Sequence, residues 1–211
     1  RQMCIRDRVW IAQLATIELH TSLSYFRDIG RPRQLVFDLD PGPPADIVLC
    51  CQVGVWLRDA FRSFGLESFA KTSGSKGLQL YVPLNTPGVD YELTKSVSKG
   101  LAQRLSQEHP SEVVFLQRKE LRGGKVLIDW SQNDQYKTTV NVYSLRARAR
   151  PTVSTPVTWD EVEGCLSAGD PSRLVFTSDQ VLERVAALGD LFEPVLSLKQ
   201  RIPESLSSQF G

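Results

Sequence analysis

Blocks of apolar residues run along the whole chain, and the spacing within each block predicts a helix or a strand. Apolar residues recur at helical spacing in four segments: residues 9–20, 44–64, 91–109 and 178–191. Short apolar runs bounded by glycine, proline or polar residues predict five strands: residues 35–40, 66–72, 78–84, 112–117 and 126–130. Strands interleaved with helices predict an α+β (α/β-like) fold, in which a mixed, largely antiparallel sheet is flanked by helices.

Residues at the ends of these blocks indicate where elements start and stop. Pro43 and Pro44 stand near the start of the second helix, and Gly65 stands directly after its end. Acidic residues near the start of residues 158–162 predict a short capped helix there. His20 is expected to close the first helix, where a histidine interacts favourably with the helix dipole.

Other segments lack an apolar period. Residues 1–8 carry four charged side chains and are interpreted as a leader that is foreign to the fold. Residues 9–193 would then form the folded domain, and residues 194–211 are expected to be a poorly ordered tail. Residues 28–33 predict a polar loop, and residues 151–156 predict a linker-like connection.

Two aspartates end the first predicted strand. Asp38 and Asp40 follow the apolar residues 35–37, and Pro41 and Gly42 end the run. Side chains two residues apart on a strand point to the same face, so the two carboxylates would lie side by side and repel each other. A hard divalent cation such as Mg²⁺ or Mn²⁺ would neutralise them, although a solvated strand end is an equally simple interpretation.

A second apolar run also ends in an acid. Residues 126–128 lead into Asp129, which repeats the arrangement of the first strand. Two such strand ends can converge at one edge of a sheet and would then offer three carboxylates to one metal site.

Groups suited to phosphate lie in two further segments. Residues 72–77 are small and polar with one lysine, so Ser73, Lys76 and backbone N–H groups could cradle phosphate. The segment lacks the spacing of a P-loop, and a plain hairpin turn is the alternative. Residues 146–150 alternate arginine with alanine, which would place guanidinium groups on one face of an extended segment; a solvated strand face is the alternative there.

Composition narrows the class of protein only slightly. The 211 residues carry a formal net charge of +1, so any nucleic-acid site would be a local patch. The four cysteines show no C-x-x-C spacing, which argues against a disulfide framework or a zinc site and fits a reducing cytosol. No apolar run approaches the roughly 20 residues that a membrane helix needs. Carboxylates for a metal together with donors for phosphate favour nucleotidyl transfer.

Four motifs, in this order and at this spacing, resemble one known family. The motifs are VFDLDPG, KTSGSKGLQLYVPL, KVLIDWSQN and KTTVNVYSLRARARP. They are similar to the polymerase (primase-polymerase) domain of bacterial DNA ligase D, which belongs to the archaeo-eukaryotic primase superfamily and acts in non-homologous end joining. The similarity extends from about residue 9 to at least residue 159.

The resemblance implies roles for individual residues. Asp38, Asp40 and Asp129 would be catalytic residues that ligate Mg²⁺ or Mn²⁺. The nucleotide would be bound by six further residues: His20, Ser73, Lys76, Gln79, Gln132 and Arg146. The implied partners are DNA ends, nucleoside triphosphates, attached ligase and nuclease domains and the Ku end-binding protein, in the bacterial cytoplasm at the nucleoid and away from membranes.

The chain departs from the family pattern in two ways. Gln79 stands where the family motif S-G-x-K-G-L-H ends in histidine, so a charge that could hold triphosphate is lost. The family domain also has a further N-terminal segment, which suggests that this chain is a fragment. Two alternatives to a polymerase are a non-catalytic nucleotide- or DNA-end-binding module and a haloacid-dehalogenase-type phosphatase, which also places D-x-D after an apolar strand.

Overall fold

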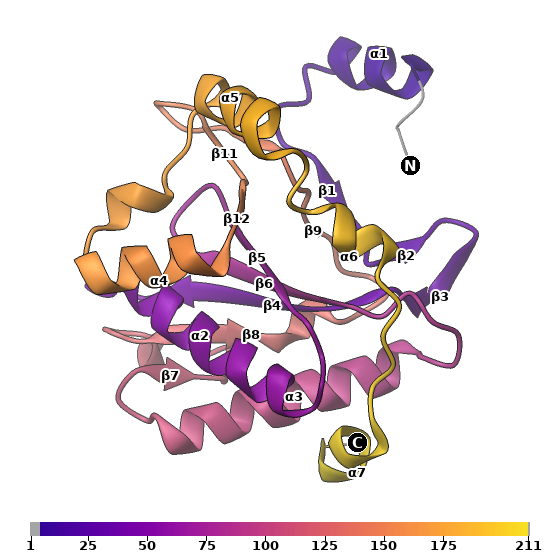
Figure 1. The fold of residues 1–211 in the computed structure, drawn as a ribbon, viewed down its shortest axis with the longest axis vertical. Coiled ribbons are helices and arrows are strands. Elements are labelled where there is room, and N and C mark those ends of the chain that lie inside the picture. Colours follow the sequence, from indigo (N-terminus) through magenta and orange to yellow (C-terminus); the bar gives the residue numbers. More distant parts are fainter. Residues whose placement is uncertain (1–4, 211) are drawn as a thin grey trace.

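A six-stranded sheet forms the centre of the molecule (Figure 1). The structure, a computed structural model, describes residues 5–210. The strand order is β12-β5-β6-β4-β8-β7, and only β7 and β8 run parallel. This confirms the expected mixed, largely antiparallel sheet. The strands are β4 (Gln34–Pro41), β5 (Phe69–Thr72), β6 (Leu78–Pro83), β7 (Val113–Val114), β8 (Val126–Asp129) and β12 (Pro156–Val157).

Helices α2 (Ile47–Ser63) and α3 (Tyr91–Glu108) cover one face of this sheet and bury the main core against it. On β4, residues Leu35, Phe37 and Leu39 are fully buried in that core. Side chains alternate along a strand, so the aspartates at the intervening positions project from the opposite face. The alternation read from the sequence therefore separates the core from the acidic face.

The long helices agree with the sequence except at their ends. Helix α2 begins after Asp46, whose Oδ1 accepts a hydrogen bond from the Val48 N–H at 2.9 Å, so the predicted start at residue 44 was too early. Gly65 has φ 73°, the left-handed conformation expected of a residue that follows a helix end. Helix α4 (Trp159–Ala168) has the predicted cap at Thr158 but continues further than residue 162.

The first predicted helix is wrong in its C-terminal half. Helix α1 (Ile5–Gln13) ends where Ala15 takes a positive φ of 50°, and it begins inside the segment interpreted as a leader; residues 1–4 of that segment lie outside the described residues. His20 lies instead in β1 (His20–Thr21), which pairs with β9 (Thr139–Val140). Backbone pairing with a segment far along the chain overrides the local helical period.

Two polar segments that were predicted to be irregular form strands. Residues 28–33 mostly form β3 (Asp28–Pro32), which pairs with β2 (Ser24–Tyr25). The expected linker at residues 151–156 contains β11 (Thr152–Val153), which pairs with β10 (Leu145–Arg146), and it runs into β12 at the edge of the main sheet. These strands are too short and too polar to show an apolar period, so sequence patterning does not detect them.

The C-terminal residues are folded, so the predicted poorly ordered tail is wrong. Helix α5 (Ser178–Leu188) is followed by α6 (Glu193–Ser197) and α7 (Glu204–Phe210). Helix α7 lies against α3, where Leu206 is fully buried and the Phe210 ring lies close to Gly100. Short 3₁₀ turns complete the description at residues Lys119–Leu121, Trp130–Gln132 and Pro171–Leu174. Within residues 5–210, every helix is too short or too polar to cross a lipid bilayer.

Candidate functional site

Four polar residues form a row across the sheet on the face opposite α2 and α3. Strand register places Asp38 of β4 directly opposite Asp129 of β8 on one side and opposite Gln79 of β6 on the other. Gln79 is in turn opposite Lys71 of β5. Residues directly opposite each other on neighbouring strands share one face, so the row places two carboxylates, an amide and an ammonium group in sequence.

The two aspartates of β4 are held in an environment that disfavours their charge. Burial, followed by the nearby Asp40 carboxylate, raises the pKa of Asp38 to about 7. Burial and the Asp129 carboxylate also raise the pKa of Asp40. The Asp38 Oδ1 atom is buried and has no hydrogen-bond partner. A buried, unpaired carboxylate oxygen beside a second carboxylate is a pair of hard ligands that a divalent cation would satisfy.

Asp129 is near this pair, but its carboxylate is already hydrogen-bonded. Its Oδ1 accepts from Gln117 Nε2 at 2.8 Å and from Ser131 Oγ at 2.6 Å, and its Oδ2 accepts from Gln132 Nε2 at 2.9 Å. Among residues 5–210, no group of three histidine, cysteine, aspartate or glutamate side chains is arranged to hold a metal ion. The structure thus brings the three predicted acids together on one face of the sheet, where Asp38 and Asp40 are the two whose carboxylates are not occupied by such hydrogen bonds.

The loop after β5 is closed by the side chain of Ser73. Ser73 Oγ accepts from the N–H groups of Ser75 at 3.2 Å and of Gly77 at 3.1 Å, and the Ser73 N–H donates to the Gly77 carbonyl at 2.9 Å. Gly77 lies so close to β4 that a Cβ atom added to it would be 2.1 Å from the Leu39 carbonyl oxygen. The loop is therefore fixed to the aspartate strand, with Lys76 exposed beside it.

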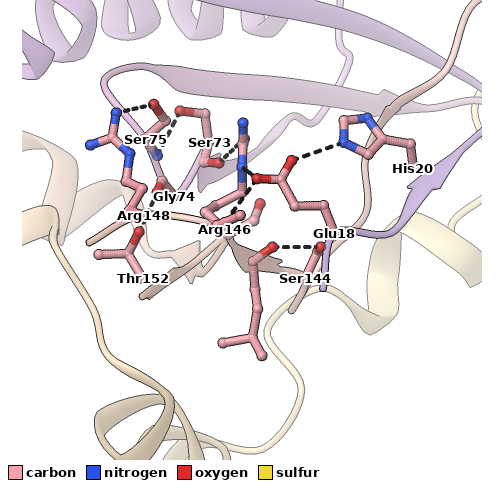
Figure 2. A network of polar contacts seen from close by, with 12 residues as sticks. Glu18, His20, Ser73, Gly74, Ser75, Ser144, Arg146, Arg148 and Thr152 are labelled. Atoms are coloured by element: carbon pink, nitrogen blue, oxygen red, sulfur yellow. Dashed lines mark hydrogen bonds and ion pairs between the residues drawn. The ribbon is translucent and has the colours of Figure 1, made fainter. Parts of the chain in front are cut away.

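Arg146 joins this loop to the N-terminal part of the chain (Figure 2). Its Nη1 donates to the Ser73 carbonyl at 2.7 Å, and its Nε lies 3.2 Å from a carboxylate oxygen of Glu18. Glu18 also accepts from the Ala147 N–H at 2.9 Å, and its other oxygen lies 3.3 Å from His20 Nε2. The Ala147 hydrogen bond is the main cause that holds the pKa of Glu18 below its ordinary value.

Sequence reasoning missed Glu18, although it stands two residues before His20. In an extended segment that spacing places both side chains on one side, and this signal was hidden by the helix predicted there. The alternating arginines are only partly as expected. Arg148 Nη2 donates to Ser75 Oγ at 2.6 Å, while Arg150 is exposed in the bend that follows β10.

One cavity of about 370 Å³ unites these groups. Arg122, which follows the 3₁₀ turn Lys119–Leu121, also lines it, and sequence reasoning did not select this residue for the site. Asp129 is the one predicted site residue that does not line the cavity, although Gln132, which donates a hydrogen bond to it, does. The other predicted site residues line it together: His20, Asp38, Asp40, Ser73, Lys76, Gln79, Gln132 and Arg146.

Comparisons with known proteins agree on one family. The family model described as "LigD, primase-polymerase domain" matches residues 4–192. The multifunctional non-homologous end joining protein LigD of Mycolicibacterium smegmatis is 40% identical over 188 residues, which are 88% of this chain and 24% of that protein. The bifunctional LigD of Bacillus subtilis is 30% identical over 86% of this chain and 29% of that protein. The chain thus spans about a quarter of the length of these curated relatives.

A solved structure shows the same fold. The polymerase domain of Mycobacterium tuberculosis ligase D, determined in complex with DNA, is similar with a TM-score of 0.80 and 40% sequence identity. The match covers 91% of this chain and 67% of that one. None of these similarities supports the phosphatase alternative.

Proposed function

Because this chain belongs to the LigD primase-polymerase domain family, we propose that it adds nucleotides to DNA ends by metal-dependent nucleotidyl transfer in non-homologous end joining. The observation that carries the proposal is the cavity beside β4. It combines two carboxylates whose pKa values are raised with a lysine, two arginines and a serine-closed loop that can bind phosphate.

Each group in the cavity has a proposed task. Asp38 and Asp40 would hold Mg²⁺ or Mn²⁺, with Asp129 joining them after releasing Gln132. The ion, when bound, supplies neutralisation of the triphosphate and activation of the attacking hydroxyl. Lys76 and Arg146 would contact the triphosphate beside the loop that Ser73 closes.

Two further proposed nucleotide-binding residues, His20 and Gln132, also line the cavity. His20, held by Glu18, would contact the part of the nucleotide that extends beyond the triphosphate. Gln132 would contact phosphate once it has released Asp129. The structural relative was solved with DNA, which supports DNA ends as the second substrate.

The wider setting is also part of the proposal. The mycobacterial relatives are named as multifunctional end-joining proteins and are about four times as long as the matched region. We therefore propose that this domain works in a bacterial cell beside ligase and nuclease domains and the Ku protein. Mg²⁺ and Mn²⁺ both suit the oxygen ligands that Asp38 and Asp40 offer.

Nucleotide binding and primer extension test the proposal in two steps. The chain is titrated with a fluorescent nucleoside triphosphate in Mg²⁺ or Mn²⁺, and extension of a DNA end with a single-stranded overhang is then measured. Asp40→Asn should abolish extension, while the matched control Asp179→Asn on exposed α5 should leave it unchanged. Failure of the wild-type chain to bind nucleotide would refute the proposal.

A binding module without turnover is the second candidate function. The hydrogen bonds that occupy both oxygens of Asp129 favour it, because they leave only two free acids for metal. Nucleotide and DNA-end binding without extension, with either metal, would establish this second function.

A further inference from the structure

Lys71 carries a buried amino group that sequence reasoning did not select, and burial lowers its pKa to about 7 while the Asp38 carboxylate opposes that shift. Its side chain is fully buried on β5, between β6 and the edge strand β12. Within residues 5–210 it takes part in no ion pair with an acidic side chain. Its Nζ donates instead to Gln79 Oε1 and, at 2.7 Å, to Ser154 Oγ. Burying a charge without a partner is costly, so its position calls for a function.

The hydrogen bonds around Gln79 fix the direction of its amide. An ammonium group only donates, so the Gln79 carbonyl oxygen must face Lys71. The Tyr81 hydroxyl donates to the same oxygen at 3.3 Å. The Gln79 NH₂ group is thereby turned to the other side, where Asp38 is its register partner on β4.

We propose that Lys71 is a positioning residue that acts on the Asp38 carboxylate through the Gln79 amide. Lys71 thereby supplies the positive charge that the Gln79 amide itself lacks. The amide dipole lies between a cation and an anion, with its carbonyl toward the cation and its NH₂ toward the anion. In this role Gln79 interacts with the Asp38 carboxylate, and the residue is only 2% exposed to solvent.

The effect on metal binding rests on the proposed function, since it requires Asp38 to ligate a cation. Mn²⁺ binding, followed by electron paramagnetic resonance, is compared in wild type, Lys71→Met, Gln79→Leu and the double variant. Losing one charge-assisted contact should weaken Mn²⁺ binding about tenfold in Lys71→Met. If Lys71 acts only through Gln79, the double variant binds no more weakly than Gln79→Leu.

If the two single-variant losses of Mn²⁺ affinity multiply in the double variant, to about a hundredfold, the proposal is overturned, because Lys71 would then act independently of Gln79. Lys199→Met is the matched control on an exposed site and should bind Mn²⁺ like wild type. Replacing a buried charge by an apolar side chain of similar size is often neutral or stabilising, so Lys71→Met should fold, and thermal unfolding verifies this.

A second measurement needs no metal and no nucleotide. Side-chain amide exchange of Gln79 is followed by NMR in the metal-free chain labelled with ¹⁵N-glutamine. The NH₂ protons should be protected in wild type and exchange at least tenfold faster in Lys71→Met, since the amide is then held from one side only. Unchanged exchange would overturn the positioning role. Absence of Mn²⁺ binding in wild type would refute the proposed function, while the exchange data would still decide the role of Lys71.

Discussion

Substitution of Gly77 by alanine should detach the phosphate-binding loop from the aspartate strand. The added Cβ would lie 2.1 Å from the Leu39 carbonyl oxygen, whereas ordinary contact begins at 3.4 Å, so the loop must move by about 1.3 Å. A shift of that size breaks the Gly77 hydrogen bonds to Ser73, which measure 3.1 and 2.9 Å. Overpacking costs about 1–3 kcal/mol and each of the two lost hydrogen bonds about 0.5–1.5 kcal/mol, so we expect a loss of about 2–6 kcal/mol.

Two assays separate the effect on stability from the effect on binding. A loss of about 2 kcal/mol in a chain of this size lowers the melting temperature by about 4–8 °C. Displacement of Lys76 should also weaken nucleoside triphosphate binding by about tenfold or more. Gly30→Ala is the control, because an added Cβ there contacts nothing within 4 Å. If Gly77→Ala melts and binds nucleotide like Gly30→Ala, the loop is not held by β4 as the structure indicates.

Three further predictions follow from the same site. Lys76→Ala should weaken nucleoside triphosphate binding by roughly 1.5–3 kcal/mol in equilibrium titration, and an unchanged affinity would make the loop an ordinary hairpin turn. Gln79→His should lower KM for nucleotide in primer extension with little change at saturation, and identical KM values would show that glutamine substitutes fully. Burial raises the pKa of Asp38 from 3.8 to about 7, so the folded chain holds this proton more tightly than the unfolded chain. The contribution of protonated Asp38 to folding stability is therefore fully present below pH 3.8 and is lost as the pH rises through 7. Asp38→Asn should therefore stabilise the metal-free chain by about 1–2 kcal/mol at about pH 8 and not at about pH 4, as measured by denaturant unfolding.

Local sequence determined the parts of the site that lie on single elements. The alternation along β4 places Leu35, Phe37 and Leu39 in the core and the two aspartates on the other face, and it needs no knowledge of neighbouring strands. The apolar spacing of α2 and α3 likewise predicts both helices, because burial of one helical face repeats every three to four residues.

Only the tertiary structure decided which segments meet. His20 pairs with Val140, and Glu18 contacts Ala147, more than a hundred residues along the chain. Neither partner affects the local apolar period, so the sequence there predicted a helix where the fold has a strand. The direction of the Asp129 carboxylate and the burial of Lys71 depend in the same way on neighbouring strands. Strand register, which is set by packing of the whole sheet, therefore decided how the charges at this site are paired.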